Sequence, residues 1–229
     1  MIPQNKILLF FWICCAFFTA SFHATGAVNN APANNVPANN APAVETILQK
    51  GFPVKADELE KTTDSLFQEY ESQKNISSLV FYSYGMLRLA NHFSQVNDFV
   101  RASEYAKTGF FYLDEAVDLY EDNPRVRYLR ARVDAYLPAN LGRCVVTLYD
   151  TDILLKEKTK FDKDILAQIN YMRYRALYSC KEYKQADALL AQIKEENPNL
   201  NLLSLGVDGT PEWDVNEVTQ VMMPLVKGE

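Results

Sequence analysis

Turn-forming residues are scarce over most of this 229-residue chain. Between residues 52 and 205 the sequence has three glycines and four prolines, namely Gly85, Gly109, Gly142, Pro53, Pro124, Pro138 and Pro198. A β-sandwich or β-barrel of this size needs many more, because its short strands are joined by turns that glycine and proline usually form. The scarcity argues against both classes and favours an all-α fold.

Positive charge is also in short supply. The chain carries 23 lysines and arginines against 29 aspartates and glutamates, which gives a net charge of −6. Nucleic acids and anionic lipids are polyanions, and the proteins that bind them present basic surface. We therefore expect no nucleic-acid partner, and contact with a membrane only by proximity.

The side chains on which most enzymes depend are nearly missing. Only His23 and His92 occur, and no CxxC, HExxH, GxxxxGK[ST] or GxGxxG motif is present. The usual zinc site needs several histidines or cysteines, and phosphate cradles need the glycine-rich loops. We expect no metal, no cofactor and no enzymatic activity.

The first residues have the order of a secretory signal peptide. Lys6 precedes a nearly unbroken apolar run, Ile7 to Phe22, which is followed by the small residues Ala24-Thr25-Gly26. At about 16 residues the run is short for a membrane span, which needs roughly 20. The pattern predicts a signal peptide over 1–26 and export to a bacterial periplasm or cell envelope. Secretion, or retention as an uncleaved anchor, is the alternative.

A repeated pentad follows the apolar run. Asn29-Asn30-Ala31-Pro32-Ala33 recurs twice with small changes and carries neither charge nor a large apolar side chain. Such a segment cannot bury enough surface to offset the entropy lost on ordering. We predict a disordered Asn/Pro/Ala linker over 27–45, which is either a spacer or a tolerated low-complexity tail, and a helical domain over 46–229.

From residue 55 onward, apolar residues recur at the three- and four-residue spacing of amphipathic helices. Stop signals such as Asp122-Asn123-Pro124 and Glu196-Asn197-Pro198 separate the periodic stretches. Thr210-Pro211-Glu212 has the form of a helix start, with a capping threonine and a proline in the first turn. The pattern predicts helices over 55–72, 76–95, 97–121, 125–137, 140–157, 162–180, 183–196 and 211–225.

The helical region contains an internal repeat. Three similar triplets, Met86-Leu87-Arg88, Tyr128-Leu129-Arg130 and Tyr171-Met172-Arg173, are offset by 42 and 43 residues. About twelve residues after each aliphatic comes a large side chain, and three later a small one; the pairs are Phe99 and Ala102, Leu141 and Cys144, and Tyr183 and Ala186. A small residue at that place lets the second helix of a hairpin approach the first closely. The spacing therefore indicates three helical hairpins.

Residues 76–198 resemble the tetratricopeptide repeat (TPR) family. The first repeat matches at Met86, Leu89, Ala90, Phe93, Phe99, Ala102 and Ala106, and the third at Tyr171, Tyr174, Tyr178, Tyr183, Ala186, Leu190 and Pro198. Arg132 and Arg175 stand where the family prefers a small residue, and the period exceeds the family's usual length of about 34 residues. The resemblance implies a short α-solenoid of three antiparallel hairpins with flanking N- and C-terminal helices, whose concave face binds a protein or peptide.

Cys144 and Cys180 are the two cysteines that remain after the signal peptide. Cys144 lies near the start of one expected helix and Cys180 near the end of the next, so an antiparallel pair would bring them together. An exported protein meets an oxidising environment, which favours a disulfide between them. The alternative is that Cys144 packs as a small hydrophobic side chain with a free thiol.

Arg88, Arg130 and Arg173 hold equivalent positions in the three repeats, so in a solenoid they would form a ladder along one face. Their guanidinium groups suit the carboxylates of an acidic peptide or of a peptide C-terminus. In the alternative interpretation each arginine pairs with an acid of a neighbouring helix, such as Glu104 or Asp134, and only braces the fold.

The sequence as a whole predicts a non-enzymatic scaffold or adaptor that binds a protein or peptide. An accessory subunit of an envelope transport or secretion system that binds a small anionic ligand is the second hypothesis. The sequence does not indicate an oligomeric state.

Overall fold

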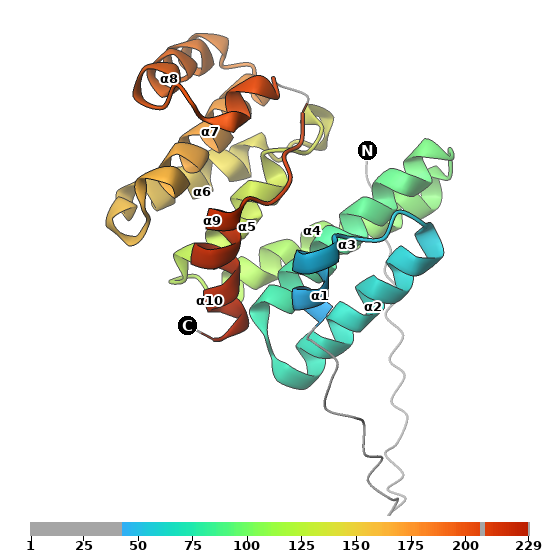
Figure 1. The fold of residues 1–229 in the computed structure, drawn as a ribbon. Coiled ribbons are helices and arrows are strands. Elements are labelled where there is room, and N and C mark those ends of the chain that lie inside the picture. The colour runs from blue at the N-terminus through green and yellow to red at the C-terminus, as the bar shows by residue number, and fades with distance from the viewer. Residues whose placement is uncertain (1–42, 207–208, 229) are drawn as a thin grey trace, which may run out of the picture. The chain divides into compact units, whose positions relative to one another are not determined.

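The computed structural model describes residues 43–206 and 209–228, and within these ranges the chain is helical with no strand. The expected signal peptide and residues 27–42 of the expected linker lie outside the described residues. The long helices follow one another through short connections (Figure 1). The α-helices are α1 Ala43–Lys50, α2 Ala56–Gln73, α3 Ile76–Gln95, α4 Phe99–Leu119, α5 Pro124–Asp134, α6 Cys144–Lys156, α7 Lys163–Ser179, α8 Tyr183–Glu196, α9 Val215–Glu217 and α10 Met223–Val226.

Short polar side chains fix where several of these helices begin. Asn75 caps α3 by accepting the amide of Ser77 at 3.0 Å, and Asp162 caps α7 by accepting the amide of Ile165 at 2.9 Å. Asn123 caps α5, with Pro124 in the first turn, where a missing N–H costs nothing. The helices therefore start within a few residues of the predicted positions.

Helix α1 begins inside the segment that was predicted to be linker. Val44 and Ile47 are buried, and the Glu69 carboxylate accepts the backbone N–H of Ala43. Burial of two aliphatic side chains against α2 and α3 stabilises this short helix. The expected boundary at residue 45 is thus at least three residues too late.

The C-terminal helical stretch begins later than Thr210-Pro211-Glu212 predicts. Its N-cap is Asp214, whose carboxylate accepts the amides of Asn216 and Glu217 at 2.8 and 2.9 Å. The Glu217 carboxylate in turn accepts the amide of Asp214 at 3.0 Å, which completes a capping box. A π-helical turn over Val218–Met222 then leads into α10. We refer to residues 209–228 as the C-terminal segment.

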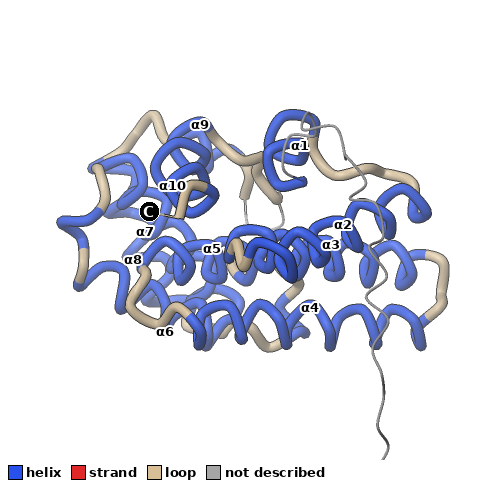
Figure 2. Tube along the Cα trace, turned by 90° about the horizontal axis from the view of Figure 1, so that it is seen from below, coloured by secondary structure: helices blue, strands red, loops and turns tan. Residues whose placement is uncertain are grey.

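The helices of the described region form three layers (Figure 2). Helices α3, α5 and α7 lie between α4 and α6 on one side and α1, α9 and α10 on the other. Consecutive helices from α2 to α8 pack against each other, and the C-terminal segment packs on α3, α5 and α7. The C-terminal segment therefore covers the face that the middle layer would otherwise present to solvent.

A disulfide joins Cys144 at the start of α6 to Cys180 at the end of α7, as the sequence predicts. The two Cα atoms are 5.6 Å apart, within the range that disulfides span. Such a bond is typical of an oxidising compartment, which fits an exported protein. Within the described ranges, no helix is both long and apolar enough to cross a bilayer.

We expect that reducing this disulfide lowers the free energy of unfolding by about 3–4 kcal/mol, because the bond closes a loop of 36 residues. Urea denaturation with and without reductant measures the change. A Cys144→Ala/Cys180→Ala variant is the control, since reductant should leave its midpoint unaltered. An unchanged midpoint for the reduced native protein would contradict the prediction.

Candidate functional site

Arg130, the central arginine of the expected ladder, is buried in an ionic cluster. Its Nε and Nη2 each donate to Asp150 at 2.8 Å, and Arg127 Nη1 donates to the same carboxylate at 2.8 Å. The Asp150 side chain is fully buried, and its ion-pair partners within the described residues are these two guanidinium groups. Arg130 therefore ties α5 to α6 and presents little to solvent.

The cluster extends to α4 through Asp114. Arg143 donates to Asp114 at 2.7 and 3.0 Å and to Asp134 at 3.0 Å, while Arg130 Nη1 reaches Asp114 at 3.2 Å. Burial raises the pKa of Asp134 to about 7, against the opposing effect of the Arg143 guanidinium. Helices α4, α5 and α6 are thus joined by paired charges.

The other two arginines of the triplets have different surroundings. Arg173 Nη1 pairs at 2.6 Å with Asp152, which is 54% exposed. Arg88 lies over the rings of Phe52 and Tyr84, at 5.5 and 5.8 Å from their centroids. Its buried Nε has no hydrogen-bond partner in the part of the chain that the structure describes.

The three arginines therefore do not form one uniform ladder. Arg130 and Arg173 pair with acids of neighbouring helices, as in the alternative interpretation, but these acids are Asp150, Asp114 and Asp152 instead of the examples Glu104 and Asp134. Of the three, Arg88 is the one that rests on aromatic rings (Phe52 and Tyr84) rather than in an ion pair. Their role in binding a partner stays a prediction.

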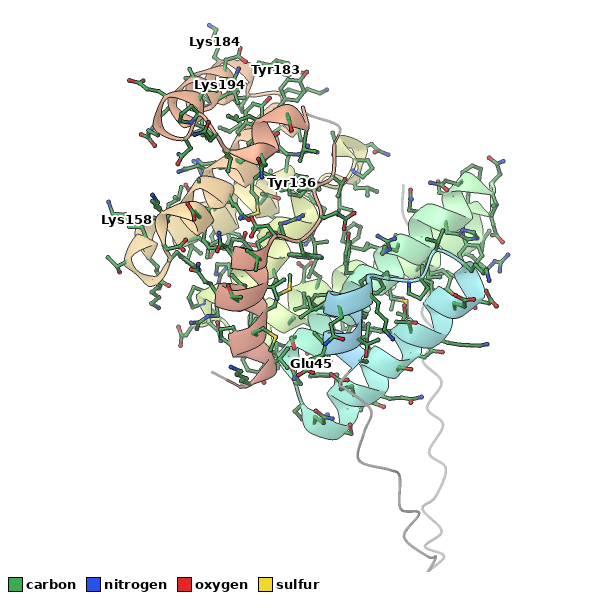
Figure 3. The ribbon with its side chains drawn as sticks, in the orientation of Figure 1. Glu45, Tyr136, Lys158, Tyr183, Lys184 and Lys194 are labelled. Carbon is green, nitrogen blue, oxygen red and sulfur yellow. A yellow bond between two sulfur atoms is a disulfide. The ribbon has the colours of Figure 1, made fainter. Side chains whose placement is uncertain are left out.

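Two other arginines hold the C-terminal segment. Arg132 lies 4.5 Å from the Tyr136 ring centroid and 4.4 Å from that of Trp213, and Arg175 lies 4.5 Å from Tyr136. We call these four side chains the arginine–aromatic cluster. Arg132 lies near the end of α5, Tyr136 two residues after that helix, Arg175 on α7 and Trp213 in the C-terminal segment; Tyr136 is labelled in Figure 3. Cation–π contacts of this kind gain strength when the cation is desolvated.

The same two guanidinium groups bind backbone carbonyls of the segment and its approach. Arg132 Nη2 donates to the carbonyls of Pro211 and Glu212 at 3.0 and 3.3 Å. Arg175 Nη1 donates to Gly206 and Gly209 at 3.1 and 2.7 Å. The carbonyls of Pro211 and Glu212 thus face arginines, and this stretch stays non-helical until Asp214.

Glu217 supplies the negative charge that the buried arginine needs. It accepts from Arg132 Nε at 2.7 Å and from the Tyr128 hydroxyl at 2.9 Å, and its side chain is only 2% exposed. The Tyr128 hydroxyl also contacts the Gln168 amide oxygen at 2.7 Å. Burial, with the Glu217 charge as the next cause, holds the pKa of Tyr128 well above its usual value, so this phenol stays a neutral hydrogen-bond donor.

Sequence reasoning missed the function of Arg132 and Arg175, although it noted both. They stand 43 residues apart, and the resemblance to the TPR family aligns both with a position where that family prefers a small side chain. That departure was the available signal. A large charged residue at two equivalent buried positions needs a partner there, and the C-terminal segment supplies it.

A cavity of about 730 Å³ lies beside the cluster, between α7, the chain after α8 and the C-terminal segment. Its size is within the range of small-molecule sites. Among the lining residues, five acids (Asp164, Glu196, Glu212, Asp214 and Glu217) outnumber two basic residues (Arg132 and Lys163). The lining is therefore unfavourable for a small anion.

Comparison with known proteins gave no match: no family model, no curated protein and no solved structure is significantly similar to the chain. The geometry of the chain itself must therefore carry any functional conclusion.

We expect Arg130→Gln to lower the free energy of unfolding by about 3–5 kcal/mol, because it removes a partner from the fully buried Asp150 carboxylate. Arg173→Gln is the matched control, and its cost should stay below about 1 kcal/mol because Asp152 is solvated. Urea denaturation of both variants measures the difference. Equal losses would show that the two arginines have the same structural role.

The raised pKa of Asp134 predicts a pH dependence of stability. Its pKa of about 7 in the folded state lies above the ordinary aspartate pKa of about 4, so between these pH values the folded state binds more protons than the unfolded state. The contribution of this group to stability is therefore present at low pH and lost as pH rises towards 7. Asp134→Asn, which cannot titrate, should reduce that decline in urea unfolding measured from pH 4 to pH 7.5. A variant with the same pH profile as the native protein would contradict the assignment.

Proposed function

We propose that the chain is an exported, non-enzymatic scaffold that binds a protein or peptide through the face formed by α3, α5 and α7. In this proposal the pairs α3–α4, α5–α6 and α7–α8 are the three hairpins of a TPR-like solenoid, located in a bacterial periplasm or cell envelope. Support for the hairpins comes from Ala102 and Ala186, the small residues of two repeats, which are buried where their second helices begin.

The observation that carries the proposal is that two arginines of this face bind the backbone of the C-terminal segment and its approach. Arg132 and Arg175 donate to main-chain carbonyls, which every peptide has, whatever its side chains. An enzyme pocket would instead direct such donors at a reacting group. A face that already binds an irregular stretch of polypeptide has the chemistry that a peptide-binding scaffold needs.

The alternative, a subunit that binds a small anionic ligand, has less support. The cavity beside the cluster is large enough, but acids dominate its lining. Arg132, its main cation, is already compensated by Glu217. A protein or peptide ligand therefore remains the better proposal.

We propose that Arg88 binds a carboxylate of the partner. It lies one helical turn beyond Tyr84, whose ring contacts Trp213 of the C-terminal segment at 6.3 Å between centroids. Its site is thus continuous with the arginine–aromatic cluster. A guanidinium supported by aromatic rings is desolvated on one side and keeps donors for an incoming carboxylate.

Site-specific photo-crosslinking tests which face is used. A photoreactive amino acid replaces Val54, which is 89% exposed and two residues from Phe52, or Phe111, which is 60% exposed on α4. After export in cells, the Val54 site should yield a crosslinked partner and the Phe111 site should not. Crosslinks from Phe111 alone would place the binding surface on the opposite layer and overturn the proposal.

We expect Arg88→Gln to weaken capture of the crosslinked partner at least tenfold while changing the melting temperature by about 2 °C or less, because Arg88 braces no ion pair between helices. Lys194→Gln, on the exposed surface of α8, is the charge-matched control and should bind normally. Undiminished capture by Arg88→Gln would remove this residue from the binding site.

A further inference from the structure

We propose that the C-terminal segment stands in for the partner on this face, and that the partner is a peptide carrying an aromatic residue and a carboxylate four residues later. The inference rests on the proposed function. In the chain itself Trp213 and Glu217 provide this pair.

The receiving groups are held by the body of the protein. Arg175 Nε donates to the carbonyl of Ala135 at 3.0 Å, and the rings and guanidinium groups of Tyr136, Arg132 and Arg175 contact one another without help from the segment. The Tyr128 hydroxyl is fixed by Gln168 of α7. A peptide would thus meet a face whose donors are already placed.

The segment brings a small set of complementary groups. Trp213 contacts Arg132 and packs near Phe81 and Tyr84 of α3, with ring centroids 6.0 and 6.3 Å apart. The Glu217 carboxylate accepts hydrogen bonds from Arg132 Nε and the Tyr128 hydroxyl. The carbonyls of Pro211 and Glu212 accept from Arg132 Nη2. Beyond them, the apolar side chains Val221, Met222 and Leu225 are buried.

If the C-terminal segment left the face and nothing replaced it, Arg132 would lose its carboxylate partner. Arg132 is 5% exposed, and without Glu217 it has no other carboxylate among the ion pairs of the described residues. A desolvated guanidinium without a carboxylate is strongly unfavourable. A ligand that replaces the segment must therefore bring a carboxylate for Arg132 and an aromatic ring for the place of Trp213.

A tethered segment competes strongly with any free peptide. Its effective concentration at the face is of the millimolar order expected for a short linker. A free partner therefore binds well only if it presents the same complementary groups as the segment, or if the segment's own contacts with the face have been weakened. This predicts that variants with a weaker segment bind the complementary peptide more tightly than the native protein does.

The test uses the full exported chain and a synthetic peptide of residues 209–228 labelled at its N-terminus with fluorescein. Fluorescence anisotropy measures the dissociation constant for the native protein and for two variants, Glu217→Gln and Trp213→Ala. Each variant weakens the tethered segment at a different group, so a folding defect in one leaves the other to decide. Far-ultraviolet circular dichroism identifies the variants that retain native helicity.

We expect the peptide to bind the folded variants at least tenfold more tightly than the native protein. A control peptide with both Trp213→Ala and Glu217→Gln should bind all three proteins weakly and equally. Equal affinity of the native peptide for native and variant proteins, or equal binding of the two peptides, would show that the segment is a permanent part of the fold. If the Val54 crosslink persists in that case, the proposed function stands and only this inference fails.

Discussion

A buried guanidinium must be met by a carboxylate or by carbonyl oxygens, and helix α5 imposes this requirement several times within three turns. Its eleven residues contain four arginines, yet every residue from Val126 to Asp134 is buried. The four arginines find acceptors in three places: Arg125 at the carbonyl of Gln220, Arg127 and Arg130 both at Asp150, and Arg132 at Glu217. Helix α6 and the C-terminal segment therefore lie where their carboxylates and carbonyl can accept hydrogen bonds from the arginines of α5.

This dependence explains why the arrangement is specific rather than merely compact. Apolar contacts tolerate small rotations of one helix against another, because they have no direction. A guanidinium that donates two hydrogen bonds to one carboxylate fixes both distance and orientation. The pairing of Arg130 with Asp150 thus sets how α5 meets α6, and that of Arg132 with Glu217 sets where the C-terminal segment lies.

Local signals in the sequence were sufficient for most of the long helices, whereas the disulfide prediction also needed two of these helices to pack antiparallel. Capping residues and apolar periodicity depend on neighbours within one turn, which is why α3, α7 and α8 were predicted nearly to the residue. The last helix was placed too early because Thr210 and Pro211 satisfy the local rule, whereas the carbonyls of Pro211 and Glu212 are taken by Arg132, about 80 residues away. The candidate site depends on such distant pairs, and no local pattern contains them.

The long separation between α5 and its last partner also bears on the order in which the chain can fold. Glu217 is 85 residues from Arg132 and 89 from Tyr128, so α5 cannot satisfy its buried charges until the C-terminal segment is available. Contacts this distant in sequence form late and slow the folding reaction. A chain synthesised from its N-terminus would keep α5 incompletely ordered until Glu217 has been made and can reach Arg132 and Tyr128.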